Sequence, residues 1–170
     1  ELKNHYSARA IYSSEMGSAL ANKVDQHLLQ LSVLAARGSA TISGGNGGSA
    51  ITDADAKTNA ASLIASIFEA AEDLDDKNVP ETDRYCVVTP DVYYQLVQND
   101  KILNRDFGGT NGVYADGTVI KVAGINIVKS NTATTAFTDQ SSASTTGQNN
   151  TYVGNFSTTA AVVFHKSAIG

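Results

Sequence analysis

Apolar residues recur at steps of three and four along the first part of the chain, and this spacing predicts one long helix over about residues 6–37. At ~1.5 Å per residue, such a helix is roughly 48 Å long. Its apolar stripe is small and weak in the first half and rich in leucine in the second half. We therefore expect the second half to be anchored in a core and the first half to lie across a surface or another subunit. The stripe comprises Tyr6, Ala10, Ser13, Gly17, Leu20, Val24, His27 or Leu28, Leu31, and Leu34 or Ala35.

The next segment is rich in glycine, and a second apolar stripe follows it. Residues 44–51 read as a flexible loop that follows Gly38, a natural helix-ending residue. This loop has no lysine and follows a helix, so it does not match a phosphate-binding Walker loop. We expect the second helix to begin at Thr52, with Asp55 completing an approximate capping box, and to end near residues 78–80. Its predicted apolar face comprises Leu63, Ile64, Ile67, Phe68, Ala71 and Leu74.

The second half of the chain alternates short strands with loops. Residues 84–88 read as a buried strand, and Thr89-Pro90-Asp91 is typical of a helix start. Two further strands are predicted at residues 118–122 and 125–129, joined by a tight turn at Ala123-Gly124. Strands are also expected at residues 152–154 and 160–165. Residues 130–150 are mostly small and polar and are predicted to form a surface loop, so deletion of residues 131–149 is expected to leave the fold intact.

Composition and charge narrow the range of functions. Charged residues make up only 17% of the 170 residues, and the remaining polar surface is mostly neutral, which favours large contacts with other protein copies. The net charge is -5 and there is no basic cluster, so sequence-specific binding of DNA is not expected. The single cysteine, Cys86, cannot form an intramolecular disulfide and is predicted to be a small buried apolar residue. No apolar run is long enough to span a membrane, and no signal peptide is visible.

The residue types of common catalytic and metal sites do not come together in the sequence. His5, His27 and His165 lack the spacing of metal ligands, and there is no Gly-x-Ser-x-Gly or His-Glu-x-x-His motif. The acidic residues at 72–76 lie at the unfavourable end of a predicted helix, which indicates a solvated end or, less simply, a partner charge or a metal. We expect no enzymatic activity and no cofactor, although distant residues such as Tyr94, Arg105 and Asp106 leave an assembled site open.

Four motifs, in this order along the chain, resemble the major capsid proteins of podoviruses, the group of coliphage T-seven. The first is the predicted long helix with Glu15-Met16-Gly17 and its leucine-rich end, and the second is the segment of residues 85–97 around Thr89-Pro90-Asp91. The third is the segment Asn104-Arg105-Asp106-Phe107-Gly108-Gly109, and the fourth is the strand pair at residues 122–131. The resemblance runs in this order from about Ile11 to Ile169, so it covers nearly the whole chain.

This resemblance implies an α+β chain with the Hong Kong 97-type capsid fold, in which a long spine helix belongs to a peripheral lobe and a mixed helix and sheet lobe lies at the capsomer axis. It places residues 1–43 in the peripheral lobe, 44–51 in a loop, 52–160 in the axial domain and 161–170 in a strand that returns to the periphery. The family also has an N-terminal arm and an extended loop, which we expect this chain to lack. Candidate subunit contacts are Tyr6 and Tyr12 on the helix and Arg105, Asp106 and Phe107 in the axial loop.

The resemblance further implies a structural protein that assembles into pentamers and hexamers of an icosahedral phage head. The implied partners are other copies of the chain, a scaffolding protein and a portal during assembly, and packaged DNA bound without specificity, with no membrane. The implied location is the virion, after assembly in the host cytoplasm. Two alternatives remain open: another virion component, such as a decoration or tail protein, and an enzyme of unknown class.

Overall fold

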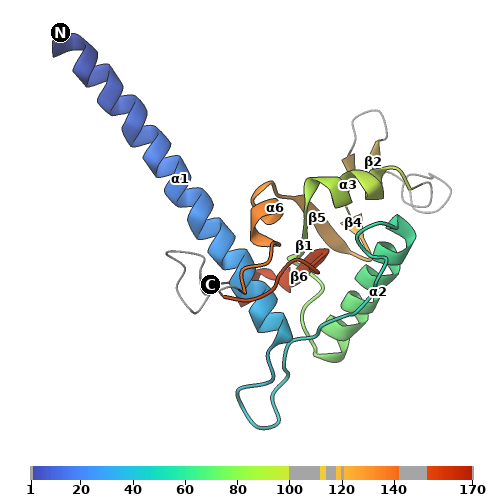
Figure 1. Ribbon diagram of the computed structural model, residues 1–170. Helices are drawn as coiled ribbons and strands as arrows, with labels where there is room; N and C mark the ends of the chain where they lie inside the picture. The colour runs from blue at the N-terminus through green and yellow to red at the C-terminus, as the bar shows by residue number, and fades with distance from the viewer. Residues whose placement is uncertain (1, 100–111, 114–117, 120, 142–152, 170) are drawn as a thin grey trace.

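The computed structural model describes residues 2–99, 112–113, 118–119, 121–141 and 153–169. Within these ranges the chain is α+β, as predicted, and a long helix projects from a sheet covered by shorter helices (Figure 1). The helices and strands in chain order are α1 (Leu2–Arg37), α2 (Ala60–Asp76), β1 (Arg84–Val88), α3 (Pro90–Val97), β2 (Gly112–Val113), β3 (Thr118–Val119), β4 (Lys121–Val122), β5 (Ile125–Lys129), α6 (Thr132–Ala136), β6 (Ala161–His165) and the 3-10 helix η2 (Lys166–Ala168).

Four strands form a mixed sheet in the order β4-β5-β1-β6. Strand β1 pairs parallel with β5 on one side and antiparallel with β6 on the other, so it is the inner strand next to the β6 edge. Strands β4 and β5 form a hairpin whose two turn residues, Ala123 and Gly124, both have positive φ, at 50° and 75°. This is the backbone of a type I′ turn, and it confirms the predicted tight turn. Strands β2 and β3 pair separately.

The sheet is covered on both faces, so the described chain has two hydrophobic cores. Figure 1 shows the sheet between α1 on one side and α2 on the other. Because neighbouring side chains on a strand point to opposite faces, Cys86 and Val88 of β1 pack in the core with α2 and α3, and Val87 packs in the core with α1 and α6. The predictions for β1 and for the buried residues Val92, Tyr93 and Leu96 of α3 are confirmed.

Cys86 is fully buried and its burial raises the pKa of the thiol to about 12. A thiol that stays protonated is a poor nucleophile and a poor metal ligand. Cys86 is therefore the small apolar core residue that the sequence predicts.

Helix α1 is anchored through its C-terminal part, as predicted, but of the predicted stripe it is Leu34, partly buried, that packs against the core. Its buried residues are Gln26, Leu29, Gln30 and Val33, whereas Leu20, Val24 and Leu28 are exposed. The prediction of the face was wrong because it followed the apolar residues, and the buried face of this helix contains two glutamines. The Gln26 side chain donates a hydrogen bond to the carbonyl of Thr135, at 3.3 Å, which gives one of these amides a partner on α6.

Helix α2 begins at Ala60 and not at Thr52, so the predicted start was wrong. Asn59 caps the helix, since its side chain accepts a hydrogen bond from the amide of Ala61 at 3.0 Å. An asparagine competes well as a cap, and the residues before it form turns. Leu63 and Ile67 of the predicted face are buried, but Phe68 is 57% exposed, which contradicts its predicted place in the core.

The predicted surface loop at residues 130–150 was wrong for its first part. Residues 132–136 form helix α6, and Ala133, Ala136 and Phe137 are buried against α1. Alanines are small enough to let two helices approach closely, so a segment that looks polar in sequence still contributes to a core. Residues 142–150 of the predicted loop lie outside the described residues.

Strand β6 confirms the strand predicted near the C-terminal end of the chain, with bounds Ala161–His165. The predicted strand at residues 152–154 is not formed by Val153 and Gly154, and Tyr152 lies outside the described residues. Gly154 instead exchanges two backbone hydrogen bonds with Gln140, at 2.9 and 3.3 Å, and so joins this segment to the end of the α6 region.

Phe137→Ala tests the role of α6, and it replaces the expectation that this segment can be deleted. The phenyl ring is buried between α6 and α1, so its removal leaves a cavity and lowers the free energy of unfolding by about 3 kcal/mol. Thr134→Ala on the exposed side of the same helix is the control, and we expect almost no change. Urea unfolding followed by circular dichroism measures both. Equal stability of the two variants would contradict the packing described here.

Candidate subunit-contact surfaces

The N-terminal part of α1 carries a ridge of exposed apolar side chains. We call Tyr12, Met16, Leu20, Val24 and Leu28 the α1 ridge. Its members are four residues apart, so each is turned by about 40° from the last and the ridge winds slowly around the helix. Tyr12, Met16 and Leu20 are 70%, 72% and 68% exposed. Single exposed apolar residues are common on proteins, but a continuous row of them marks an interaction surface.

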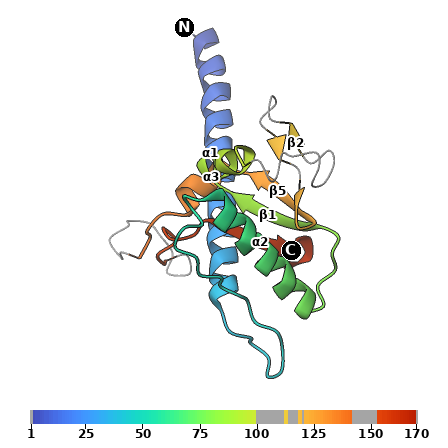
Figure 2. The ribbon, with the colours of Figure 1, turned by 90° about the vertical axis from the view of Figure 1, so that its right-hand side faces the viewer.

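The helix holds Tyr12, Met16, Leu20 and Val24 of this ridge away from the rest of the chain, whereas Leu28 lies in the anchored part of the helix. Both views of the ribbon show the N-terminal half of α1 extending past the sheet and the other helices (Figures 1 and 2). The first buried residue of α1 among those described is Gln26. From Arg9 to Asp25 the helix spans about 26 Å at ~1.5 Å per residue. A projection of this length leaves most of its circumference exposed.

Contacts at the C-terminal end of α1 fix the direction of the projection. Arg37 Nη1 donates to the carbonyl of Asn155 at 2.7 Å, and its guanidinium lies 5.8 Å from the ring centre of Phe156. Phe156 is fully buried beside Leu29 and Val33 of α1. Together with α6, these contacts clamp the last turns of the helix, so that the ridge has a defined orientation relative to the sheet.

The five predicted contact residues fall into three groups. Tyr12 is on the α1 ridge and highly exposed, as a contact residue must be. Tyr6 belongs to α1, but its side chain is outside the described residues, and so are Arg105, Asp106 and Phe107. Sequence reasoning expected the first half of the helix to lie at a surface or another subunit, but it did not single out Met16 as a contact, and it assigned Leu20, Val24 and Leu28 to the apolar stripe. Their spacing of four residues could have marked them as a separate face.

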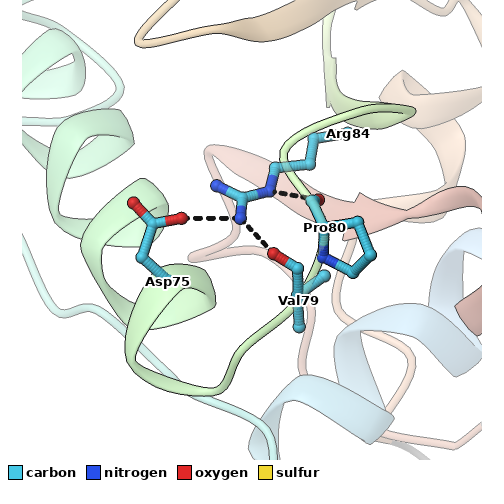
Figure 3. A network of polar contacts seen from close by, with 4 residues as sticks. All are labelled: Asp75, Val79, Pro80 and Arg84. Atoms are coloured by element: carbon cyan, nitrogen blue, oxygen red, sulfur yellow. Dashed lines mark hydrogen bonds and ion pairs between the residues drawn. The ribbon is translucent and has the colours of Figure 1, made fainter.

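One of the acids at the end of α2 has a partner charge. Figure 3 shows the guanidinium of Arg84, at the start of β1, donating to Asp75, Val79 and Pro80. The Arg84 Nη2 to Asp75 Oδ1 distance is 2.6 Å, and the Nε to Pro80 carbonyl distance is 2.9 Å. Arg84 is only 3% exposed while Asp75 is 56% exposed. The acid therefore neutralises a buried charge from the surface, and this explains its place at an unfavourable helix end.

The described residues contain neither a cluster of metal-ligand side chains nor a membrane-spanning helix. Within them, no three histidine, cysteine or acidic side chains gather closely enough to hold a metal ion. Burial, followed by the nearby charge of Lys23, lowers the pKa of His27. No described helix is both long and apolar enough to cross a bilayer.

A family model described as "Gp10A-like: Major capsid protein" matches residues 1–170. The chain belongs to this major capsid protein family. The family agrees with the resemblance found in the sequence. No curated protein matches the chain.

Two solved phage capsids share the fold of this capsid-family chain. One is the capsid of the cyanophage P-SCSP1u, with 41% identity and a TM-score of 0.78 over 93% of this chain and 50% of that chain. The other is the mature capsid of bacteriophage PhiM1, with 23% identity and a TM-score of 0.74 over 92% of this chain and 49% of that chain. The fold is thus that of a phage capsid protein, in agreement with the Hong Kong 97-type assignment. The chain spans about half the length of these capsid proteins.

The loop before α2 of this capsid-family chain is fastened by one carboxylate. Asp53 accepts hydrogen bonds from the hydroxyls of Ser62 and Ser66, which lie one turn apart on α2, and from the amide of Asp55. The bond from Ser62, followed by the backbone bond from Asp55, lowers the pKa of Asp53. This set of bonds folds residues 53–58 back onto the helix.

Arg84→Ala should lower the free energy of unfolding by about 3 kcal/mol, because it leaves a cavity and removes the donor for two carbonyls and a carboxylate. Asp75→Asn is the matched variant, and we expect a loss of about 1 kcal/mol or less, because this carboxylate is largely solvated. Chemical denaturation compares the two. A larger loss for Asp75→Asn would show that the ion pair, and not the carbonyl bonds, carries the network.

The Asp53 bonds make the loop before α2 sensitive to acid. The pKa of the Asp53 carboxyl is lower in the folded chain than in the unfolded chain. The contribution of this carboxylate to stability is therefore complete above the unfolded pKa of about 4 and is lost as the pH falls through the folded pKa. The protection of the amides of residues 53–58 against hydrogen exchange, taken relative to the intrinsic rate at each pH, is expected to fall over that acidic range in the natural sequence. In Asp53→Asn this protection should be low and nearly independent of pH in the same range. Protection in the variant equal to that of the natural sequence would contradict this role.

Proposed function

We propose that this chain is the part of a major capsid polypeptide that carries the spine helix, and that it assembles with copies of itself into the shell of a tailed-phage head. The observation that carries the proposal is the match of the whole chain to the capsid family. Its role is structural and not enzymatic. One fold makes related contacts in pentamers and hexamers, and closure of these contacts makes an icosahedral shell.

The α1 ridge is the surface that suits this role best. A Leu or Met side chain that becomes buried contributes about 1.5–3 kcal/mol, so a few ridge residues can provide a useful contact energy. A contact spread over a rod also tolerates small changes of angle, since neighbouring ridge residues face different directions. We assign Tyr6 and Tyr12 to contacts along this rod, and Arg105, Asp106 and Phe107 to contacts near the capsomer axis.

The division into lobes is part of the same proposal. We assign residues 1–43 to the peripheral lobe, residues 52–160 to the axial domain and residues 161–170 to the return strand. The clamp of Arg37 and Phe156 supports a fixed junction between the helix and the domain. A scaffolding protein and a portal serve as assembly partners in the host cytoplasm, and packaged DNA lies against the finished shell without specific contacts.

Negative-stain microscopy of the full-length protein coexpressed with its scaffolding protein tests the function. Closed shells are the expected result. Persistent monomers that remain folded would overturn the proposal. Binding of the protein to the outside of phage heads that have already formed would instead indicate a decoration protein.

Leu20→Glu tests the α1 ridge in the same assay. The substitution puts a charge where an apolar contact forms, so the yield of closed shells is expected to fall at least about tenfold, which corresponds to about 1.4 kcal/mol. Ser18→Glu adds the same charge on the other side of the helix and should leave the yield nearly unchanged. The melting temperatures of the unassembled variants separate loss of contact from loss of folding. Equal shell yields for both variants would exclude the ridge as a subunit contact.

A further inference from the structure

Two tyrosines hold the ammonium group of Lys129 in a fixed place. Its Nζ donates a hydrogen bond to Tyr94 Oη at 2.9 Å, and it lies 4.6 Å from the ring centre of Tyr94 and 5.2 Å from that of Tyr93. Tyr93 is buried, and its ring meets that of Tyr94 edge to face, with the ring centres 5.7 Å apart. A lysine on a protein surface is normally free to move. This arrangement therefore removes much of the entropy that Lys129 would lose on binding a partner.

The Lys129–Tyr94 pair still has donors for a carboxylate. An ammonium group has three donors, and Tyr94 Oη takes one of them. Because this oxygen accepts the bond, its own proton remains available as a donor. Both side chains are exposed, and no described carboxylate lies within ion-pair distance of Lys129. The bond to Tyr94 also raises the pKa of Lys129, so the group stays charged. The pair is preorganised to bind a carboxylate through charge-assisted hydrogen bonds.

The negative charge of the chain is concentrated elsewhere, around the C-terminal end of α2. Residues 69–84 contain seven acidic and two basic side chains, a net charge of -5, and the whole chain carries the same net charge. On α2 itself, Phe68, Glu72 and Asp76 are exposed and four residues apart, and we call them the α2 row. Residues at this spacing are neighbours on one side of a helix, about 6 Å apart along its axis. The row therefore presents an aromatic ring followed by two carboxylates.

The Lys129–Tyr94 pair and the acidic end of α2 lie at opposite ends of β1. Lys129 is the register partner of Val88, at the end of the strand. Asp75 is bonded to Arg84, at the start of the strand. A strand of this length spans about 17 Å at ~3.3 Å per residue. Figures 1 and 2 both show α3 beyond one end of β1 and the C-terminal end of α2 near the other. A contact between the two features joins two copies head to tail, and repeated head-to-tail contacts can close into rings.

We propose that the Lys129–Tyr94 pair of one copy binds a carboxylate of the α2 row, Glu72 or Asp76, of the neighbouring copy in the same pentamer or hexamer. This contact rests on the proposed function, which supplies the rings. Phe68 lies beside the carboxylates and gives the exposed ring of Tyr94 an aromatic partner. A single ion pair on an exposed surface contributes little, but every copy in a ring repeats it, and the pairing of unlike charges sets which sides of two copies meet.

A cross-linker that adds no spacer tests the contact on the full-length capsid protein. A water-soluble carbodiimide joins a lysine to a carboxylate only when the two side chains touch. Shells are assembled with the scaffolding protein from a mixture of ¹⁴N- and ¹⁵N-labelled protein, treated with the carbodiimide, and analysed by mass spectrometry after proteolysis. The expected result is a mixed-isotope link from Lys129 to Glu72 or Asp76.

The other outcomes of this experiment separate the contact from the function. Shells in which Lys129 forms no link, a link within one copy, or a link to other acids would overturn the contact and leave the function standing. A natural sequence that forms no shells would overturn the function and the contact with it.

Charge reversal tests the same contact without a cross-linker. Lys129→Glu places a carboxylate against carboxylates, so the yield of closed shells is expected to fall at least about tenfold. Adding Glu72→Lys and Asp76→Lys to this variant reverses both sides of the contact and should restore most of the yield. Lys166→Glu makes the same change of charge on another exposed side chain and should leave the yield nearly unchanged.

The melting temperatures of the unassembled variants identify any that are not folded. A full yield from Lys129→Glu would overturn the contact. So would a folded triple variant that assembles no better than Lys129→Glu alone.

Discussion

Strand β1 has both of its faces buried and both of its edges paired, and the rest of the described fold depends on that placement. Cys86 and Val88 belong to one core and Val87 to the other, so each core is held in register with the other through a single strand. The strand can be buried because β5 and β6 satisfy its backbone groups on either side. Arg84 begins the strand, and its guanidinium ties the end of α2 to it. A shift of β1 would therefore disturb both helix layers at once.

The sequence predicted the elements whose signals are local. Tyr85-Cys86-Val87-Val88 is apolar throughout, Pro90 can start a helix but not continue a strand, and Ala123-Gly124 joins two apolar runs at hairpin spacing. These features need no knowledge of distant residues. The start of α2 was harder to predict, because both Thr52 and Asn59 could cap a helix. In the structure Asn59 is the cap, and Asp53 accepts hydrogen bonds from Ser62 and Ser66 within the helix.

The predictions that were wrong concern features that are determined by tertiary contacts. The period of α1 was correct, but its buried face depends on α6, and α6 is a short run of threonine and alanine with no strong signal of its own. Gln30 shows the same limit: it is completely buried, and neither of its amide atoms has a hydrogen-bond partner in the part of the chain described. No rule based on hydrophobicity would place it there. Of the candidate contact surface, Tyr12 was predicted and the remaining ridge was not, because an exposed leucine and a buried leucine look alike in a sequence.

Helix α1 is continuous from its exposed end to its clamped end, and this continuity has a mechanical consequence. Its last turns are held by Arg37, Phe156 and α6, while its N-terminal part extends well beyond them. An α-helix is stiff over such a length, so a sideways force at the exposed end acts on the clamp with the whole projection as its lever arm. A small rotation of the sheet thus becomes a much larger displacement at the tip. Movement of any molecule bound along the exposed part of α1 would in turn exert a torque on β1.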